Sequence, residues 1–117
     1  MWKNKQIEVE EPIKIDGIQS IEERENETFI KLSGVINSQV CNELMEKDLF
    51  SNERLTIDLD DVTYLSSAGI KILSQFGLNA TAKNVEYQVI NASEYLAKIL
   101  NMTGYASSFK LVLKEAE

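Results

Sequence analysis

The chain has no histidine and one cysteine, Cys41, among its 117 residues. The missing histidine excludes a histidine-based zinc site and every triad or acid–base mechanism that uses an imidazole. A single cysteine cannot form a disulfide within the chain, and the apolar stripe around Cys41 predicts a buried structural thiol. Catalysis by Asp, Glu, Lys or Ser stays open, but no Gly-x-x-x-x-Gly-Lys phosphate loop occurs. A small hydrolase or nucleotide-binding enzyme is therefore disfavoured.

Positive charge is scarce as well. The chain has 12 Lys and Arg residues against 19 Asp and Glu residues, which gives a net charge of −7. A domain this acidic repels phosphate backbones and anionic lipid, so nucleic-acid binding and direct membrane insertion are not expected. Residues 1–12 contain no apolar stretch of secretory type, and no run approaches the roughly 18 apolar residues of a membrane span. We therefore expect a cytoplasmic protein.

Only one proline and five glycines interrupt the chain. Pro12 and Gly17 bracket a short segment, which predicts an N-terminal extension over residues 1–16 and one domain over residues 17–117. Apolar residues alternate within the extension and indicate an additional edge strand; they are Ile7, Val9, Ile13 and Ile15.

Apolar periodicity predicts strands alternating with helices over the rest of the chain. Two short strands on either side of a polar turn at 25–27 form a hairpin. The expected strands are 18–24, 28–32, 55–59, 85–89 and 109–113; the expected helices run from Asn37 or Ser38 to Asp48, from 66 to 80, and from Asn91 or Ser93 to a cap at Gly104. This order is typical of an α/β domain: a mixed, mostly parallel sheet with an N-terminal antiparallel hairpin and helices packed against it.

Polar residues gather where the third predicted strand ends. Ligands of open α/β sheets bind beyond the carboxyl ends of the strands, where loops meet helix N-termini. Residues 60–65 are expected to form a turn here, and Ser66 and Ser67 to begin the next helix. Asp58, Asp60 and Asp61 are expected to be solvated in this turn, with a divalent-cation site as the alternative. The helix then buries an apolar stripe formed by Gly69, Ile72, Leu73, Phe76 and Ala80.

Residues 55–73, LTIDLDDVTYLSSAGIKIL, resemble the signature of the STAS domain, the fold of anti-sigma factor antagonists. Family members have a strand ending in an Asp-rich turn, then an aromatic residue, an aliphatic residue and Asp-Ser-Ser/Ala-Gly. Three more segments are similar to family motifs in the same order: LSGVIN (32–37), YQVINAS (87–93) and ILNMTG (99–104). The chain departs from the family pattern at Ser66 and Asn37, where the family frequently has Asp.

This resemblance implies a binding protein without catalytic residues, metal or cofactor. Ser67 takes the position of the family's phosphoacceptor, and Ser66 is the alternative acceptor. Such a protein, when unphosphorylated, binds an anti-sigma factor, usually a serine kinase with a GHKL-type ATP-binding fold, and so frees a sigma factor. The kinase ends binding by phosphorylation, and a PP2C-type phosphatase reverses it. The implied contact residues are Asp60, Asp61, Ser66, Ser67, Ala68, Gly69, Ile70 and Ser74.

Electrostatics at Ser67 are suited to such a switch. A helix N-terminus tolerates a phosphate, because it presents N–H groups without partners and a partial positive charge. Phosphorylation takes the net charge from −7 to about −9, and a partner fitted to a neutral hydroxyl then meets like-charge repulsion. Ile70 is expected outside the buried stripe, where it forms a docking face with Ser74, Gly77 and Leu78. The alternative within the family is the accessory subunit of a phospholipid-transport ABC system, which docks an ATPase without phosphorylation.

Overall fold

The computed structural model describes residues 16–102 and 109–114, and it confirms the predicted order of strands and helices. The elements within these ranges are β1 (Gly17–Arg24), β2 (Glu27–Ile36), α1 (Ser38–Met45), β3 (Arg54–Leu65), α2 (Ser67–Ala82), β4 (Glu86–Ala92), α3 (Glu94–Met102) and β5 (Lys110–Leu113). The predicted N-terminal edge strand and the predicted cap at Gly104 lie outside the described residues.

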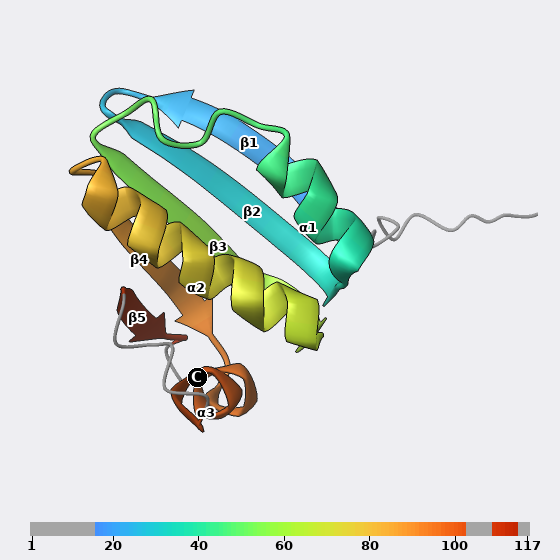
Figure 1. The fold of residues 1–117 in the computed structure, drawn as a ribbon. Helices are drawn as coiled ribbons and strands as arrows, with labels where there is room; N and C mark the ends of the chain where they lie inside the picture. The colour runs from blue at the N-terminus through green and yellow to red at the C-terminus, as the bar shows by residue number, and fades with distance from the viewer. Residues whose placement is uncertain (1–15, 103–108, 115–117) are drawn as a thin grey trace, which may run out of the picture.

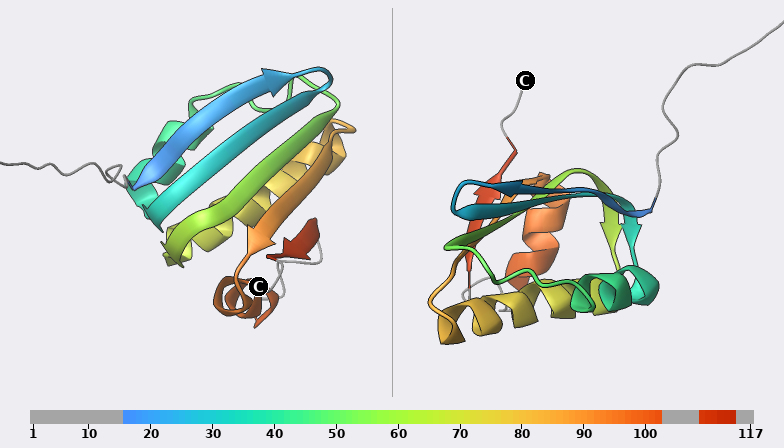
Figure 2. Two further views of the ribbon diagram at one scale, coloured as in Figure 1. Left: turned by 180° about the vertical axis from the view of Figure 1, so that it is seen from behind. Right: turned by 90° about the horizontal axis from the view of Figure 1, so that it is seen from above.

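The strands form one sheet in the order β1-β2-β3-β4-β5. β1 pairs antiparallel with β2, and the pairs that follow are parallel, so the mixed, mostly parallel sheet is confirmed. α1 and α2 lie side by side across one face of the sheet, and α3 stands near the end of β4 (Figure 1). In the part of the chain that the structure describes, no helix covers the opposite face (Figure 2).

The core lies between the sheet and the helices. Every residue of the stripe predicted for the second helix is buried in α2, so this prediction is confirmed. The stripe packs on strand residues whose side chains alternate toward the helices, chiefly Ile30, Leu32, Leu55, Ile57 and Val89. Tyr87 also packs in this core, with its ring against Phe76. Its hydroxyl donates to the Leu73 carbonyl at 2.9 Å. Burial raises the pKa of Tyr87 well above its ordinary value.

Side-chain caps settle where the first and third helices begin. Asn37 Oδ1 accepts from the backbone N–H of Val40 at 3.1 Å, so Asn37 rather than Ser38 is the N-cap of α1. Ser93 Oγ accepts from the N–H of Leu96 at 3.1 Å and precedes α3 in the same way. Cys41 on α1 is 5% exposed, as predicted, and burial raises the pKa of its thiol.

The second and third strands are longer than the sequence predicts. β2 continues through Gly34 to Ile36, and β3 continues through residues 60–65, where we expected a turn. That expectation is wrong because each segment provides the other's hydrogen-bond partners: Ser33 pairs with Asp61, and Ile36 pairs with Leu65. The pairing shifts register twice, and at the second shift the Asp16 carboxylate accepts from the N–H of Val35 at 2.9 Å.

The C-terminus of α2 is closed by a left-handed asparagine. Asn84 has φ of 59°, the N–H of Val85 donates to the Ala80 carbonyl at 2.8 Å, and the N–H of Asn84 donates to the Thr81 carbonyl at 3.3 Å. These two bonds form a Schellman motif, in which glycine or asparagine occupies the left-handed position.

We expect Asn84→Ala to lower the free energy of unfolding by about 1 kcal/mol, because alanine is strained in the left-handed region. Asn84→Gly should keep or slightly raise this free energy, since glycine adopts the same conformation without strain. Urea denaturation followed by circular dichroism measures both. Equal stability of the two variants would contradict the strain argument.

Candidate functional site

Two helices begin side by side at one edge of the sheet. Ile36 and Leu65, which end β2 and β3, are paired with each other. Each strand is followed directly by a helix, α1 after Asn37 and α2 after Ser66 (Figure 1). The positive ends of two helix dipoles therefore meet at the carboxyl edge of the sheet. This is the edge where the sequence predicted a site.

Ser66 ties the start of α2 to the end of β2. Its hydroxyl donates to the Ile36 carbonyl at 2.8 Å, and its backbone N–H donates to the same oxygen at 3.0 Å. The Ser66 oxygen also accepts from the N–H of Gly69 at 3.1 Å, which makes Ser66 the N-cap of α2. The Ser66 hydroxyl therefore has both a donor and an acceptor role inside the fold.

Ser67 is the first residue of α2, and its side chain is exposed. Within the described ranges, its hydroxyl forms no hydrogen bond, and the N–H groups of Ser67 and Ala68 have no partner. The first turn of α2 also has no acidic residue. Ser67 thus presents an accessible hydroxyl beside unpaired N–H groups at the positive end of a helix.

Gly69 allows the close approach of α2 to β2. A Cβ atom at this position would lie 2.8 Å from the Ile36 carbonyl oxygen and 3.2 Å from its Cγ2 atom. Because the oxygen belongs to the backbone, a side chain at position 69 would push the helix away from the strand. Gly69 is buried and its role is to let α2 pack closely on β2, so we do not expect it to contact a partner.

The expected docking face is only partly exposed. Ile70 is half-buried and packs against the core, so our expectation that it lies outside the buried part of the helix is correct only in part. Ser74 is 7% exposed, and its hydroxyl donates to the Ile70 carbonyl at 2.8 Å. The expectation of Ser74 and Gly77 on the exposed face is therefore wrong, while Leu78 is exposed as expected.

The three aspartates belong to β3 and not to a solvated turn. Asp58 is buried and accepts from the Asp60 N–H and from Asn91 Nδ2 at 3.0 Å. Lys114 Nζ lies 2.9 Å from Asp60, and Lys31 Nζ lies 3.6 Å from Asp61. No group of metal-ligating side chains occurs among the described residues, so the cation alternative finds no support.

Asp60 and Asp61, which the resemblance placed with Ser67 among the contact residues, lie well before it along β3. Asp61 precedes Ser66 by five positions, which at about 3.3 Å per strand residue corresponds to about 16 Å. Tyr64, which we did not expect to be part of the site, is 47% exposed and lies two residues before Ser66. The sequence does contain a signal for the exposure of Tyr64, because Thr63 and Tyr64 lie next to each other between the apolar residues Val62 and Leu65, which are buried.

The model of the STAS domain matches residues 18–117. The chain belongs to the STAS domain family. The matched range begins in β1 and includes α1, α2 and α3, so the site at the start of α2 is part of this STAS domain.

Solved structures similar to this STAS domain include three anti-sigma factor antagonists. The unphosphorylated form of SpoIIAA has a TM-score of 0.67 at 12% identity over 86% of this chain and 90% of that one. A putative antagonist from Thermotoga maritima has a TM-score of 0.71 at 11% identity over 80% and 84%. An antagonist from Mycobacterium paratuberculosis has a TM-score of 0.58 at 24% identity over 83% and 86%. These similarities support the same fold.

No helix in the described part of this STAS domain has the length and hydropathy of a membrane span.

The different roles of the two serines give a stability test. We expect Ser66→Ala to lower the free energy of unfolding by about 0.5–2 kcal/mol, because it removes the cap of α2 and the hydroxyl bond to Ile36. Ser67→Ala is the matched control and should change this free energy by less than about 0.5 kcal/mol, as exposed positions usually do. Urea denaturation measures the free energy of unfolding of both variants. A larger decrease in Ser67→Ala than in Ser66→Ala would contradict our assignment of Ser66 as the cap.

Proposed function

We propose that this STAS domain is an anti-sigma factor antagonist that works by partner switching. In its unphosphorylated form it binds an anti-sigma factor that is also a serine kinase with a GHKL-type ATP-binding fold. The kinase phosphorylates Ser67 and thereby ends binding, and a PP2C-type phosphatase restores the hydroxyl. Membership of the STAS family and the similarity to three antagonists support this proposal. In this role the domain is a substrate and a binder without catalytic residues, metal or cofactor.

The observation that carries the proposal is the contrast between the two adjacent hydroxyls. Ser67 is exposed, while Ser66 donates to Ile36 and caps α2. Phosphoryl transfer forms a bond from Ser67 Oγ to the γ-phosphorus of ATP, releases ADP and removes the hydroxyl proton. The same transfer to Ser66 would remove the proton that its hydroxyl donates to Ile36 and place a bulky phosphate at the oxygen that caps α2. Ser67 is therefore the acceptor, and Ser66 is the residue that holds it in place.

A phosphate on Ser67 acts on the interface and leaves the fold intact. The unpaired N–H groups of the first turn favour an anion there, and two helix dipoles add to this effect. The group adds about −1.5 to −2 charges to a chain of −7. A partner fitted to the neutral hydroxyl then meets repulsion and a desolvation cost. The exposed neighbours that complete the contact are Tyr64 and the outer parts of Ala68 and Ile70.

The assignment of Ser67 is tested by phosphorylation in vitro. We expect incubation with Mg-ATP and the GHKL-type kinase encoded nearest to the gene to add the mass of one phosphoryl group to the full chain. Ser67→Ala should stay unmodified, and Ser66→Ala should still be modified, because its acceptor is intact. Intact-mass spectrometry reads all three. Modification of Ser67→Ala would move the acceptor to another residue.

Binding tests the electrostatic part of the proposal. We expect Ser67→Asp to weaken binding of the anti-sigma factor by about tenfold or more, equivalent to about 1.4 kcal/mol, because one charge imitates part of the phosphate effect. Its melting temperature should stay close to wild type, since an acidic residue is favourable in the first turn of a helix. Asn101→Asp adds the same charge on α3 and is the control for calorimetric titration. Equal affinity of wild type and Ser67→Asp would contradict the switch.

A further inference from the structure

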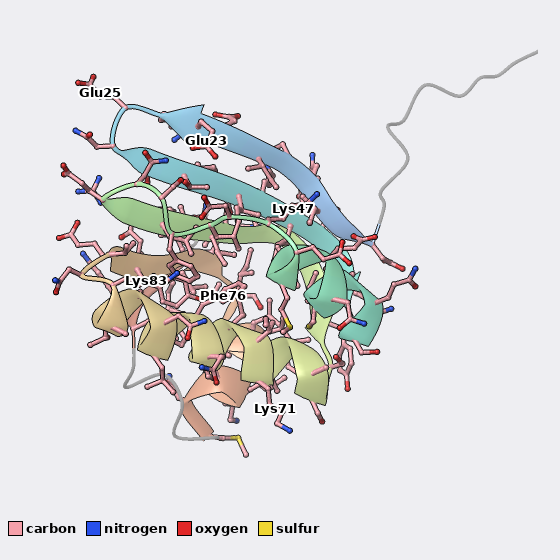
Figure 3. The ribbon with its side chains drawn as sticks, turned by 45° about the horizontal axis from the view of Figure 1, so that its top comes forward. Glu23, Glu25, Lys47, Lys71, Phe76 and Lys83 are labelled. Carbon is pink, nitrogen blue, oxygen red and sulfur yellow. The ribbon has the colours of Figure 1, made fainter. Side chains whose placement is uncertain are left out.

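A groove of about 250 Å³ lies between α2 and the segment that follows α1. Residues of the α1 C-terminus and the following loop form one wall, and one stripe of α2 from Ile72 to Asn79, together with the C-cap Lys83, forms the other. Phe76 lies between Lys47 and Lys83 in the view of Figure 3, and all three line the groove. The groove is separate from the start of α2, where Ser67 lies.

The floor of the groove is apolar. Phe50 is half-buried and meets Phe76 edge to face, with ring centroids 5.7 Å apart. Leu44 and Leu49, which are buried, also line the groove, and Met45 lines it with 66% of its surface exposed. A flexible, polarisable methionine beside two aromatic rings suits contact with an apolar side chain.

The rim of the groove has unpaired positive charge. Lys83 Nζ lies 5.5 Å from the centre of the Phe50 ring, and Lys47 lines the opposite wall. Within the described ranges neither ammonium group has an ion-pair partner, whereas Arg24, Lys31, Arg54 and Lys114 of the sheet are all paired with carboxylates. Asp48 also lines the groove, so its rim carries one negative charge against two positive ones. An occupant that complements this rim is acidic and has an apolar side chain for the floor.

The groove lies within reach of a partner that covers Ser67. Phe76 on α2 and Lys83, the C-cap of α2, follow Ser67 by nine and 16 positions, which is about 14 and 24 Å along the helix axis. A stable interface covers about 800 Å² of each partner, a patch about 30 Å across. A partner centred between these points contacts both ends of α2.

We propose that the groove is a second contact for the anti-sigma factor and takes an acidic segment of that partner, with one apolar side chain entering beside Phe50 and Phe76. This inference rests on the function proposed above and adds a second contact, here called the anchor, that phosphorylation of Ser67 does not affect directly. The anchor lies too far from Ser67 for the phosphate to touch it. Phosphorylation therefore weakens the complex through one end of α2 and leaves the contact at the other end in place.

The test uses two groove variants, each with a control of the same chemistry on α3. Lys47→Glu reverses a rim charge and is matched by Lys98→Glu; Met45→Glu places a charge over the floor and is matched by Met102→Glu. All four side chains are exposed, so we expect each variant to fold. The measurement is the dissociation constant for the full chain with the kinase that phosphorylates Ser67, at low and high salt. Urea melts verify that each variant is folded.

We expect each groove variant to weaken binding by about tenfold and each control by less than about twofold, with the effect of Lys47→Glu shrinking as salt is raised. Combined with Ser67→Asp, the fold-changes should multiply, because the two contacts are more than about 10 Å apart. If Ser67→Asp weakens binding and the groove variants match their controls, the groove proposal is overturned and the switch stands. If Ser67→Asp and the groove variants all bind like wild type, the proposed function fails.

Two further outcomes concern other occupants. A change in oligomeric state of Met45→Glu on size-exclusion chromatography, with unchanged affinity for the anti-sigma factor, would assign the groove to a second copy of the chain. Binding of wild type to phosphatidylcholine–phosphatidylglycerol vesicles that Lys47→Glu abolishes would assign it to lipid. Either result overturns the proposal.

Discussion

The carbonyl oxygen of Ile36 is the point to which the start of α2 is attached. It accepts hydrogen bonds from both the N–H and the hydroxyl of Ser66, and it lies only 2.8 Å from where a Cβ atom at position 69 would be. These contacts let α2 begin directly over the end of β2, beside the start of α1. Ser66 must turn inward to make its two bonds, and the next residue, Ser67, is exposed. Accessibility of the proposed switch therefore depends on a backbone oxygen in another strand.

Extended pairing of β2 and β3 determines the charge pattern near this edge. Because β3 continues to Leu65, Asp60 and Asp61 are strand residues that lie close to lysines of the sheet. Asp58 is held by Asn91, whose left-handed backbone interrupts the regular pairing of β4. The acidic residues of this segment thus contribute to the sheet, and the surface around Ser67 lacks an acidic residue in the first turn of α2. A phosphate there changes the local charge more than it would in an acidic turn.

Ion pairs are distributed unevenly between the sheet and the layer of helices that covers it. The ion pairs of the described residues all use cations on or next to the strands, whereas Lys47, Lys71 and Lys83, on or after the helices, have no such partner. α1 and the segment after it also carry the exposed carboxylates Glu43, Glu46 and Asp48, so these lysines leave no net positive charge on the helical layer. That layer also contains Ser67 and the groove beside Phe76. On this layer, a local excess of positive charge is confined to the rim of the groove, where Lys47 and Lys83 stand beside Asp48.

The sequence by itself determined the elements whose signals are local. Apolar alternation and helical stripes predicted the hairpin, the order of strands and helices, the buried face of α2 and the thiol of Cys41, because burial is periodic along one element. Local signals failed where pairing with a distant segment decides the outcome. Asp60 and Asp61 are typical of a turn, yet β2 supplies residues 60–65 with hydrogen-bond partners and makes them a strand. Likewise, Ser66 and Ser67 are equivalent as local capping residues, and only the Ile36 carbonyl, 30 positions earlier, distinguishes the cap from the accessible hydroxyl.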